Sequence, residues 1–239
     1  MTVSSESAET AGRPTTPQRN FTAVARRYDS INRILTCGRI TVARRKAIDS
    51  LPTTSNKFLD LCCGTGEFGR ALRLRYPGST IIGVDINRSM LAQAVSRDCY
   101  DLVLAQDVAT LELPPGSFNC VVLSLAYHDL GDGGEQVLAM SGRLLAPAGR
   151  LVSLELSLPE SPLMRWLLVR VLRALESLLT ILSRPVLAHT VREIRMSPDW
   201  RSVVHEFEAA GFSLMSTTTF LLGVLRLNIY IKGRTHDPA

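Results

Sequence analysis

The chain has 239 residues, of which 46% are hydrophobic and 21% are charged, values ordinary for a soluble globular protein with one sizeable α/β domain. Its net charge of +5 arises from 27 basic and 22 acidic residues, but the arginines are scattered and lack the interleaved aromatic residues of a nucleic-acid groove. Nucleic acid is therefore not an expected partner.

The N-terminal part predicts a tail followed by two helices. Residues 1–20 are polar and lack the apolar run of a signal peptide, so we expect a disordered tail. Apolar residues repeat at helical spacing from Val24 to Leu35 and predict a helix over residues 21–35. A second helix is expected over about 39–50.

The next segment alternates predicted strands and helices. Short apolar runs predict strands over residues 57–61, 79–85, 100–107, 118–126 and 149–156. The helices predicted between them cover residues 67–75, 89–97 and 133–145. Such alternation is typical of a mostly parallel, doubly wound sheet.

A long apolar stretch at 163–182 follows the fifth strand. Its charged residues fall within roughly 140° of arc at about 100° per residue. They are Arg165, Arg170, Arg173 and Glu176. This pattern predicts an amphipathic helix, within a helical insertion over 160–190, and not a membrane span. Two interpretations stay open. The helix packs on the protein's own core, or it has a functional role, either as an apolar lid over a lipophilic substrate or as a peripheral contact with a membrane.

The C-terminal residues predict one helix and two strands. Ser197 and Pro198 match an N-cap and first-turn proline of a helix that stops at Gly211. Residues 213–221 and 225–232 predict an antiparallel hairpin. The expected fold class is therefore α/β, a doubly wound, Rossmann-like sheet of seven strands that is mostly parallel and closed by the hairpin.

The segment FLDLCCGTGEFGRAL carries the pattern G-x-G-x-x-G at Gly64, Gly66 and Gly69. In such folds the ligand binds at the carboxyl ends of the strands. Asp60 at the strand end and Glu67 in the first helical turn would repel a pyrophosphate and attract a cation. S-adenosylmethionine (SAM), which carries an ammonium and a sulfonium group, is the ligand that these residues favour.

Two further strand ends carry residues expected to hold the adenosine. Asp85 can accept hydrogen bonds from both ribose hydroxyls, and Asp107 can accept one from the adenine amino group, with the Val108 N–H facing a ring nitrogen. Met90 could pack on the adenine or serve only in the core. The residues expected at the cofactor are Tyr28, Asp60, Gly64, Gly66, Asp85, Ile86, Met90, Asp107, Val108 and Ser124.

These motifs resemble the class I SAM-dependent methyltransferases, and specifically the UbiE/MenG quinone C-methyltransferase family. The stretch FTAVARRYDSINRILTCGRITVARR resembles its N-terminal block, FLDLCCGTGEFGRAL its motif I and GVDINRSML its adenosine motif. The resemblance implies one methyltransferase domain over residues 21–239, with SAM as cofactor. It also implies an N-terminal helical lid over 21–50, in which Tyr28 closes over the cofactor.

The five cysteines are odd in number, form no C-x-x-C pair and have no nearby histidine at ligand spacing. We therefore expect no disulfide framework and no metal site, and a reducing cytoplasm fits this cysteine usage. Cys62 and Cys63 are expected to be small buried fillers and not nucleophiles.

The sequence departs from that family after the fourth strand, where Tyr127-His128-Asp129 replaces the family's Leu-Arg-Asn. His128 is the expected general base, because it lies beside the cofactor edge and titrates near neutrality. Asp129 could be the base instead, and Tyr127 could only wall the pocket. Glu155, at the end of the fifth strand, could face the pocket or cap the polar edge of the sheet.

The leading hypothesis is a SAM-dependent methyltransferase that acts on a lipophilic aromatic, quinone-like or polyketide-type small molecule, as in secondary metabolite biosynthesis. One alternative keeps the cofactor but changes the reaction, as in a tailoring enzyme that uses SAM without methyl transfer, such as a cyclase. Another is a non-catalytic protein that binds SAM and assists a partner enzyme. The sequence predicts no oligomeric state.

Overall fold

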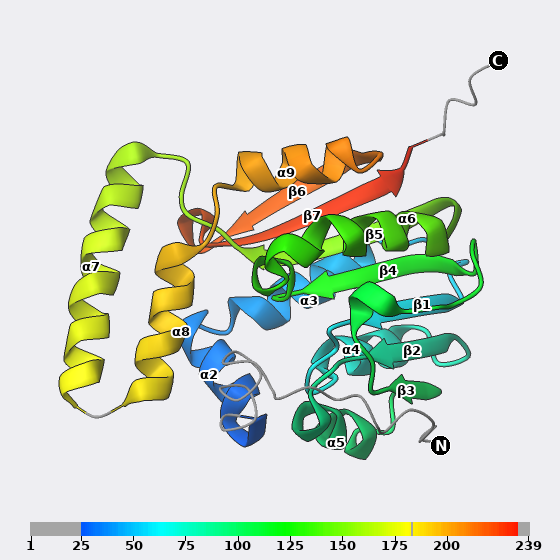
Figure 1. Cartoon of the computed structure of the whole chain (residues 1–239), viewed down its shortest axis with the longest axis horizontal. Helices are drawn as coiled ribbons and strands as arrows, with labels where there is room; N and C mark the ends of the chain where they lie inside the picture. Colours follow the sequence, from blue (N-terminus) through cyan, green and yellow to red (C-terminus); the bar gives the residue numbers. More distant parts are fainter. Residues whose placement is uncertain (1–24, 183, 234–239) are drawn as a thin grey trace.

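A seven-stranded sheet forms the centre of the computed structural model, which describes residues 25–182 and 184–233 (Figure 1). The strands are β1 (Lys57–Leu61), β2 (Thr80–Val84), β3 (Leu102–Leu104), β4 (Phe118–Ser124), β5 (Leu145–Leu156), β6 (Phe212–Phe220) and β7 (Leu225–Lys232). They lie in the order β3-β2-β1-β4-β5-β7-β6. The first five pair in parallel, whereas β7 runs antiparallel to both β5 and β6. The predicted fold class, including the antiparallel hairpin, is confirmed.

Helices cover both faces of the sheet. One face carries α3 (Arg39–Asp49), α4 (Glu67–Arg75) and α5 (Arg88–Ser96), and the other carries α6 (Gly134–Leu144) and α9 (Trp200–Ala209) (Figure 1). Because side chains alternate along a strand, Phe58 of β1 packs into the first layer and Leu59 into the second. Both are fully buried. The parallel strands thus end together at one edge, between two covered faces.

The N-terminal helix begins later than the sequence pattern predicts. A 3₁₀ turn at Ala25–Arg27 precedes α2 (Tyr28–Leu35), and the predicted tail over 1–20, like residues 21–24, lies outside the described residues. Gly38 then adopts a left-handed φ of 73°, which lets the chain turn sharply into α3. The turn places Tyr28 and Asp29 above the end of β1.

Two C-terminal predictions need correction. The structure contains a further helix, α8 (Pro185–Met196), and Ser197 ends α8 where a cap of the next helix was predicted. The N-cap of α9 is Asp199, whose carboxylate accepts a hydrogen bond from the Arg201 N–H at 3.1 Å. β5 also begins earlier than predicted, because a register shift lets Leu145 pair with Phe118.

The predicted amphipathic helix is α7 (Pro162–Ile181), and it lies beside α8 at one end of the molecule, away from the sheet (Figure 1). Leu172 of α7 packs with Val191 and Ile194 of α8, and Leu35 of α2 packs against the same cluster. One side of α7 therefore belongs to the core of the protein. In the described part of the chain, no helix combines the length and apolarity needed to cross a membrane.

Candidate functional site

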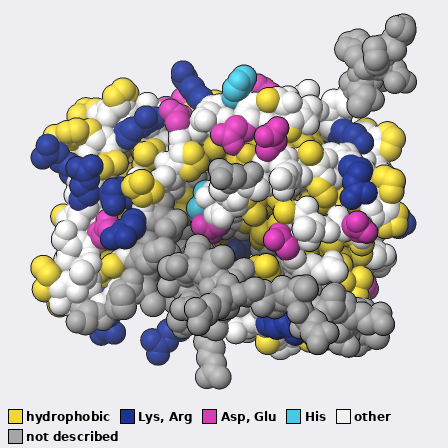
Figure 2. All heavy atoms as spheres, in the orientation of Figure 1, with side chains coloured by type: hydrophobic (Ala, Val, Ile, Leu, Met, Phe, Trp, Pro, Cys, Tyr) yellow, Lys and Arg dark blue, Asp and Glu magenta, His cyan; other side chains and the backbone are white. Residues whose placement is uncertain are grey.

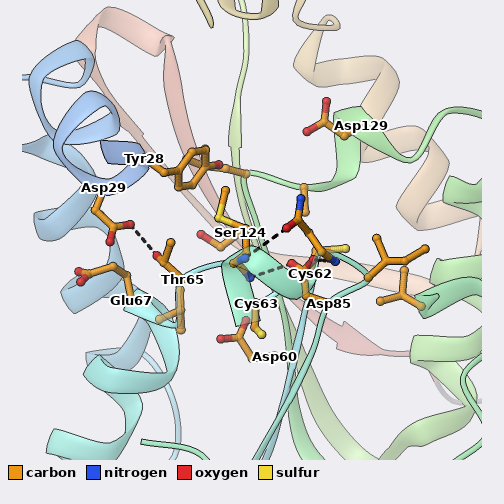
Figure 3. A pocket seen from close by; sticks show the side chains of 18 of the residues that line it. Tyr28, Asp29, Asp60, Cys62, Cys63, Thr65, Glu67, Asp85, Ser124 and Asp129 are labelled. Carbon is orange, nitrogen blue, oxygen red and sulfur yellow. Dashed lines mark hydrogen bonds between the residues drawn. The ribbon is translucent and has the colours of Figure 1, made fainter. Parts of the chain in front are cut away.

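A cavity of about 400 Å³ opens at the carboxyl ends of β1, β2 and β4, beneath α2 (Figure 3). All but three of the predicted site residues line it. Those that do are Tyr28, Asp60, Gly64, Asp85, Ile86, Met90, Asp107, Val108, Ser124 and Asp129. Gly66, Tyr127 and His128 do not. Asp60, Asp85 and Asp107, at the ends of β1, β2 and β3, thus meet at one cavity.

The glycines of the loop after β1 shape the backbone. Gly64 and Gly66 adopt left-handed φ angles of 54° and 84°, which favour glycine. A Cβ on Gly66 would lie 3.1 Å from both Ala94 and Tyr100, so a larger residue would push α5 away. Gly66 thus holds the loop against α5 and does not contact the cavity.

Asp60 lies at the base of the cavity and is held by a tyrosine that the sequence analysis missed. The Tyr100 hydroxyl donates a hydrogen bond to Asp60 Oδ2 at 2.6 Å, and both side chains are buried. Tyr100 packs where Gly69 and Gly83 have no side chain, since a Cβ on Gly69 would lie 2.3 Å from its ring. Burial raises the pKa of Asp60 to about 7, although the Tyr100 bond opposes this rise.

Asp85, at the end of β2, accepts hydrogen bonds from two backbone N–H groups. The Gly64 N–H donates to Oδ2 and the Asn87 N–H donates to Oδ1, each at 2.8 Å. Burial raises the pKa of Asp85, and these hydrogen bonds counteract the rise. Each carboxylate oxygen keeps a second lone pair that can accept a hydrogen bond from a hydroxyl group.

Asp107 begins the 3₁₀ turn after β3. Its Oδ1 accepts a hydrogen bond from the Ala109 N–H at 2.9 Å, and Val108 beside it is buried against the cavity. Met90 of α5 is also buried and lines the same part of the cavity. This end of the cavity therefore joins apolar walls to a carboxylate, which suits a flat heterocycle with an amino group.

Glu67 does not add free negative charge to the cavity, contrary to the inference from the sequence. Its Oε1 lies 2.6 Å from Arg97 Nη1, and its Oε2 lies 3.7 Å from Arg44 and 3.6 Å from Arg70. Three guanidinium groups thus balance its charge. Asp60, Asp85 and Asp107 are the other predicted cofactor carboxylates that line the cavity and can attract a cation.

The same network ties α2 to the glycine loop. Arg97 Nη2 lies 2.6 Å from Asp29 Oδ2, and the Thr65 hydroxyl donates to Asp29 Oδ1 at 2.7 Å (Figure 3). Arg97 also donates through Nε to the Thr65 carbonyl. Asp29 therefore fastens the start of α2 over the cavity, next to Tyr28. Burial raises the pKa of Tyr28 to about 12, so its phenol is neutral at physiological pH.

His128 and Glu155 form a largely buried pair beside the cavity. Glu155 Oε2 lies 2.9 Å from His128 Nδ1, while Oε1 accepts hydrogen bonds from the N–H groups of Ala126 and Tyr127 at 3.2 and 3.1 Å. His128 Nε2 lies 3.7 Å from Asp129 Oδ2, and Asp129 lines the cavity. Two roles were predicted for Glu155, facing the pocket or capping the polar edge of the sheet. Its side chain does not line the cavity, and its carboxylate is turned toward His128 and the N–H groups after β4.

Tyr127 points elsewhere. Its hydroxyl donates to Glu206 of α9 at 2.6 Å, and its ring packs edge-on against Phe207, with 4.9 Å between the centroids. The structure therefore does not bring Tyr127 to the cavity. Cys62 and Cys63 both line the cavity, and burial raises the pKa of both thiols, which disfavours their nucleophilic form.

Comparison with known proteins places the chain in one family. The model of the ubiE/COQ5 methyltransferase family matches residues 10–232. A demethylmenaquinone methyltransferase of Thermus thermophilus is 36% identical over 144 residues, which are 58% of this chain and 65% of that protein. One from Mycolicibacterium vanbaalenii is 30% identical over 219 residues, 89% of this chain and 93% of that protein. A solved SAM-dependent methyltransferase of Thermotoga maritima shares the fold with a TM-score of 0.64 and 17% identity, over 90% of this chain and 99% of that one.

The cavity fits the cofactor that this family implies. The Ser124 hydroxyl is buried at its wall and has no hydrogen-bond partner among the described residues, so a polar group of a ligand can satisfy it. A Cβ on Gly64 would meet only the Cys62 carbonyl, at 4.0 Å, so a ligand can approach the backbone closely. With a family model that spans most of its length and a cavity that accepts the expected nucleoside, the chain belongs to the ubiE/COQ5 methyltransferase family and is a SAM-dependent methyltransferase.

Proposed function

We propose that the protein methylates a lipophilic, quinone-type aromatic acceptor and that His128 is the general base. The observation that carries this proposal is the largely buried pair of Glu155 and His128, 2.9 Å apart, next to the cavity at the end of β4. The names of the relatives, demethylmenaquinone methyltransferases, support an acceptor of this class. We also infer that this acceptor reaches the site from a membrane, with which the protein makes peripheral contact.

The pair suits proton removal from an acidic aromatic acceptor. Glu155 is fixed by two backbone N–H groups and accepts the Nδ1 proton of His128, which makes Nε2 the basic nitrogen. Nε2 can then take a proton from a phenol or an activated carbon while the ring stays aligned. Asp129, 3.7 Å from Nε2, stabilises the imidazolium that forms.

When bound, SAM would supply an electrophilic methyl group to the acceptor, with S-adenosylhomocysteine as the leaving group. The residues of the protein align and protect this step. Asp85 and Asp107 orient the nucleoside, Asp60 attracts the ammonium group, and Tyr28 covers the cavity from above. The acceptor proton goes to His128, so atoms and charges balance.

Labelled SAM and a panel of naphthoquinols, benzoquinols and simple phenols test this function. We expect label in a quinol product, with one S-adenosylhomocysteine released for each methyl transferred. His128→Asn should lower kcat by a factor of about 10² to 10⁴ without changing SAM affinity, because it removes the base only. His205→Asn, at an exposed position of α9, is the matched control.

Two results would contradict the proposal. Label transfer to no member of the panel would exclude the acceptor class, and full activity of His128→Asn would exclude the base. Conversion of an acceptor without any S-adenosylhomocysteine would instead indicate a reaction in which SAM is not consumed.

A further inference from the structure

One side of α7 is apolar and faces outward. With the following residue, it presents six large hydrophobic side chains whose exposed fractions range from 49% to 79%. They are Leu163, Leu167, Val171, Leu178, Ile181 and Leu182, hereafter the outer face of α7. Isolated exposed apolar residues are ordinary, but a row of them along one helix marks an interaction surface. The inner side of α7 is already packed on α8, so these residues have no role in the core.

Positive charge accompanies the outer face. Arg170 and Arg173 are exposed, and the Arg170 guanidinium lies 4.4 Å from the centre of the Trp166 ring. Trp166 is itself 54% exposed. Figure 2 shows hydrophobic and basic side chains gathered on the left edge, where α7 lies. Residues 161–196 contain six arginines and two glutamates and so supply most of the net charge of the chain.

Negative charge is absent from this side of the helix. The sole acidic residue of α7 is Glu176, which faces α8 and pairs with Arg192 at 2.6 Å and Arg195 at 3.1 Å. If two copies of the chain met symmetrically through α7, arginines would face arginines and no carboxylate of α7 would be left to pair with them. A bilayer with anionic headgroups instead offers an apolar interior for the leucines and phosphates for the arginines.

We propose that the outer face of α7 lies in the surface of an anionic lipid membrane. Its apolar side chains enter the acyl boundary, Trp166 lies at the level of the headgroups, and Arg170 and Arg173 bind lipid phosphates. The helix lies in the plane of the membrane and does not cross it, in keeping with its interrupted apolar pattern.

Docking in this way places the membrane at the end of the molecule where α7, α8 and α2 lie together. Leu35 at the end of α2 packs on the α7–α8 cluster, and Tyr28 and Asp29 at its start line the cavity. We infer that a lipophilic acceptor dissolved in the membrane reaches the cavity along this end of the molecule, past α2. This last step rests on the proposed function, whereas membrane binding itself does not.

Sedimentation with vesicles tests the surface. The full chain is mixed with vesicles of equal parts phosphatidylglycerol and phosphatidylcholine, or of phosphatidylcholine alone, without SAM or acceptor. We expect binding to the anionic vesicles, with a blue shift of Trp166 fluorescence. Arg170→Gln and Arg173→Gln should each weaken binding about fivefold. Leu163→Ser with Ile181→Ser should weaken it at least about tenfold.

Matched controls lie on other helices. Leu74→Ser in α4 changes a leucine that is 76% exposed, and Arg45→Gln in α3 changes an arginine whose side chain is 86% exposed. Both should bind vesicles like the original protein. SAM affinity, measured for every variant, confirms that each is folded.

Three outcomes would overturn the inference. They are no binding to anionic vesicles, equal losses in the controls and the α7 variants, and a dimer in light scattering that the α7 variants convert to monomers. The last would assign the outer face to a second copy of the chain. Methylation of a quinol by a protein that ignores vesicles would refute the docking surface and leave the proposed acceptor intact.

Discussion

The affinity for SAM should depend on pH through Asp60. Burial raises the pKa of this carboxyl to about 7, so in the ligand-free protein it is half protonated near neutrality. The ammonium of SAM is attracted to the ionised form, and affinity should therefore rise as the pH rises through about 7 and fall below it. From pH 7 to pH 5.5, the loss should reach about 15-fold if only ionised Asp60 binds the ligand.

Titration calorimetry over this range measures the effect. An α-amino group of ordinary pKa, about 7.7 to 8.0, stays charged below pH 7, so the ligand does not add to the slope. Asp60→Asn should bind weakly at pH 7 and show a flat profile. Tyr100→Phe removes the hydroxyl that lowers the pKa of Asp60 and should move the midpoint to higher pH.

Asp85 is the other buried carboxyl of the cavity whose pKa is raised, and Asp85→Asn separates its contribution. This variant should lose affinity and keep the slope, because Asp60 is intact. An affinity that is constant between pH 5.5 and pH 7, or a slope that survives in Asp60→Asn, would refute the assignment of the ammonium to Asp60.

The remaining predictions concern packing and the cover of the cavity. Gly69→Ala places a Cβ 2.3 Å from the Tyr100 ring and should lower the free energy of unfolding by about 1 to 3 kcal/mol in urea titrations. Gly78→Ala, which has open space around it, should cost far less, and equal costs would contradict the packing argument. Asp29→Asn removes the pair with Arg97 and should speed SAM dissociation about fivefold in stopped-flow measurements, because the pair is worth about 1 kcal/mol. Asp49→Asn, in an exposed pair with Arg45, is the control, and an unchanged rate in Asp29→Asn would refute the lid role predicted for α2.

The sheet and the cofactor carboxylates were predictable because their signals are local. Each strand is a short apolar run that ends at a turn, and parallel strands end at a common edge. Asp60 lies near the end of one such run, and Asp85 and Asp107 follow two others, so their convergence on one cavity needs no knowledge of distant contacts. The residues of the glycine loop were found for the same reason.

The neutralisation of Glu67 was not predictable, because it depends on contacts between distant segments. Arg97 lies 68 positions from Asp29 along the chain, yet joins it to Glu67 across the glycine loop. Nothing in the spacing marks Arg97 among the 24 arginines of the chain. The loop pattern alone therefore overstates the negative charge of the cavity.

The partners of Asp60 and His128 were hidden for a related reason. Tyr100 reaches Asp60 only because Gly69 and Gly83 lie beneath its ring, in two different elements. Glu155 was recognised at a strand end, but its direction depends on the turn at Ala126 and Tyr127, which follows the neighbouring strand β4. Which residues of neighbouring strands lie side by side depends on the register of their pairing, and a single sequence does not state that register.

The α8 helix was missed although its apolar residues lie at helical spacing. Ala188, Val191 and Ile194 are buried at intervals of three residues, but polar residues dilute the pattern between them. The cap of α9 was misplaced because two good cap residues lie close together. Ser197, which precedes a proline, and Asp199 are both suitable, and only the backbone shows that Asp199 is used.

A crystal structure with S-adenosylhomocysteine tests the central claim most directly. We expect ribose hydroxyls on Asp85, adenine beside Asp107 and Val108, and the sulfur atom turned toward the Ser124–His128 side of the cavity. A sulfur atom turned away from His128, or an adenine bound outside this cavity, would contradict it.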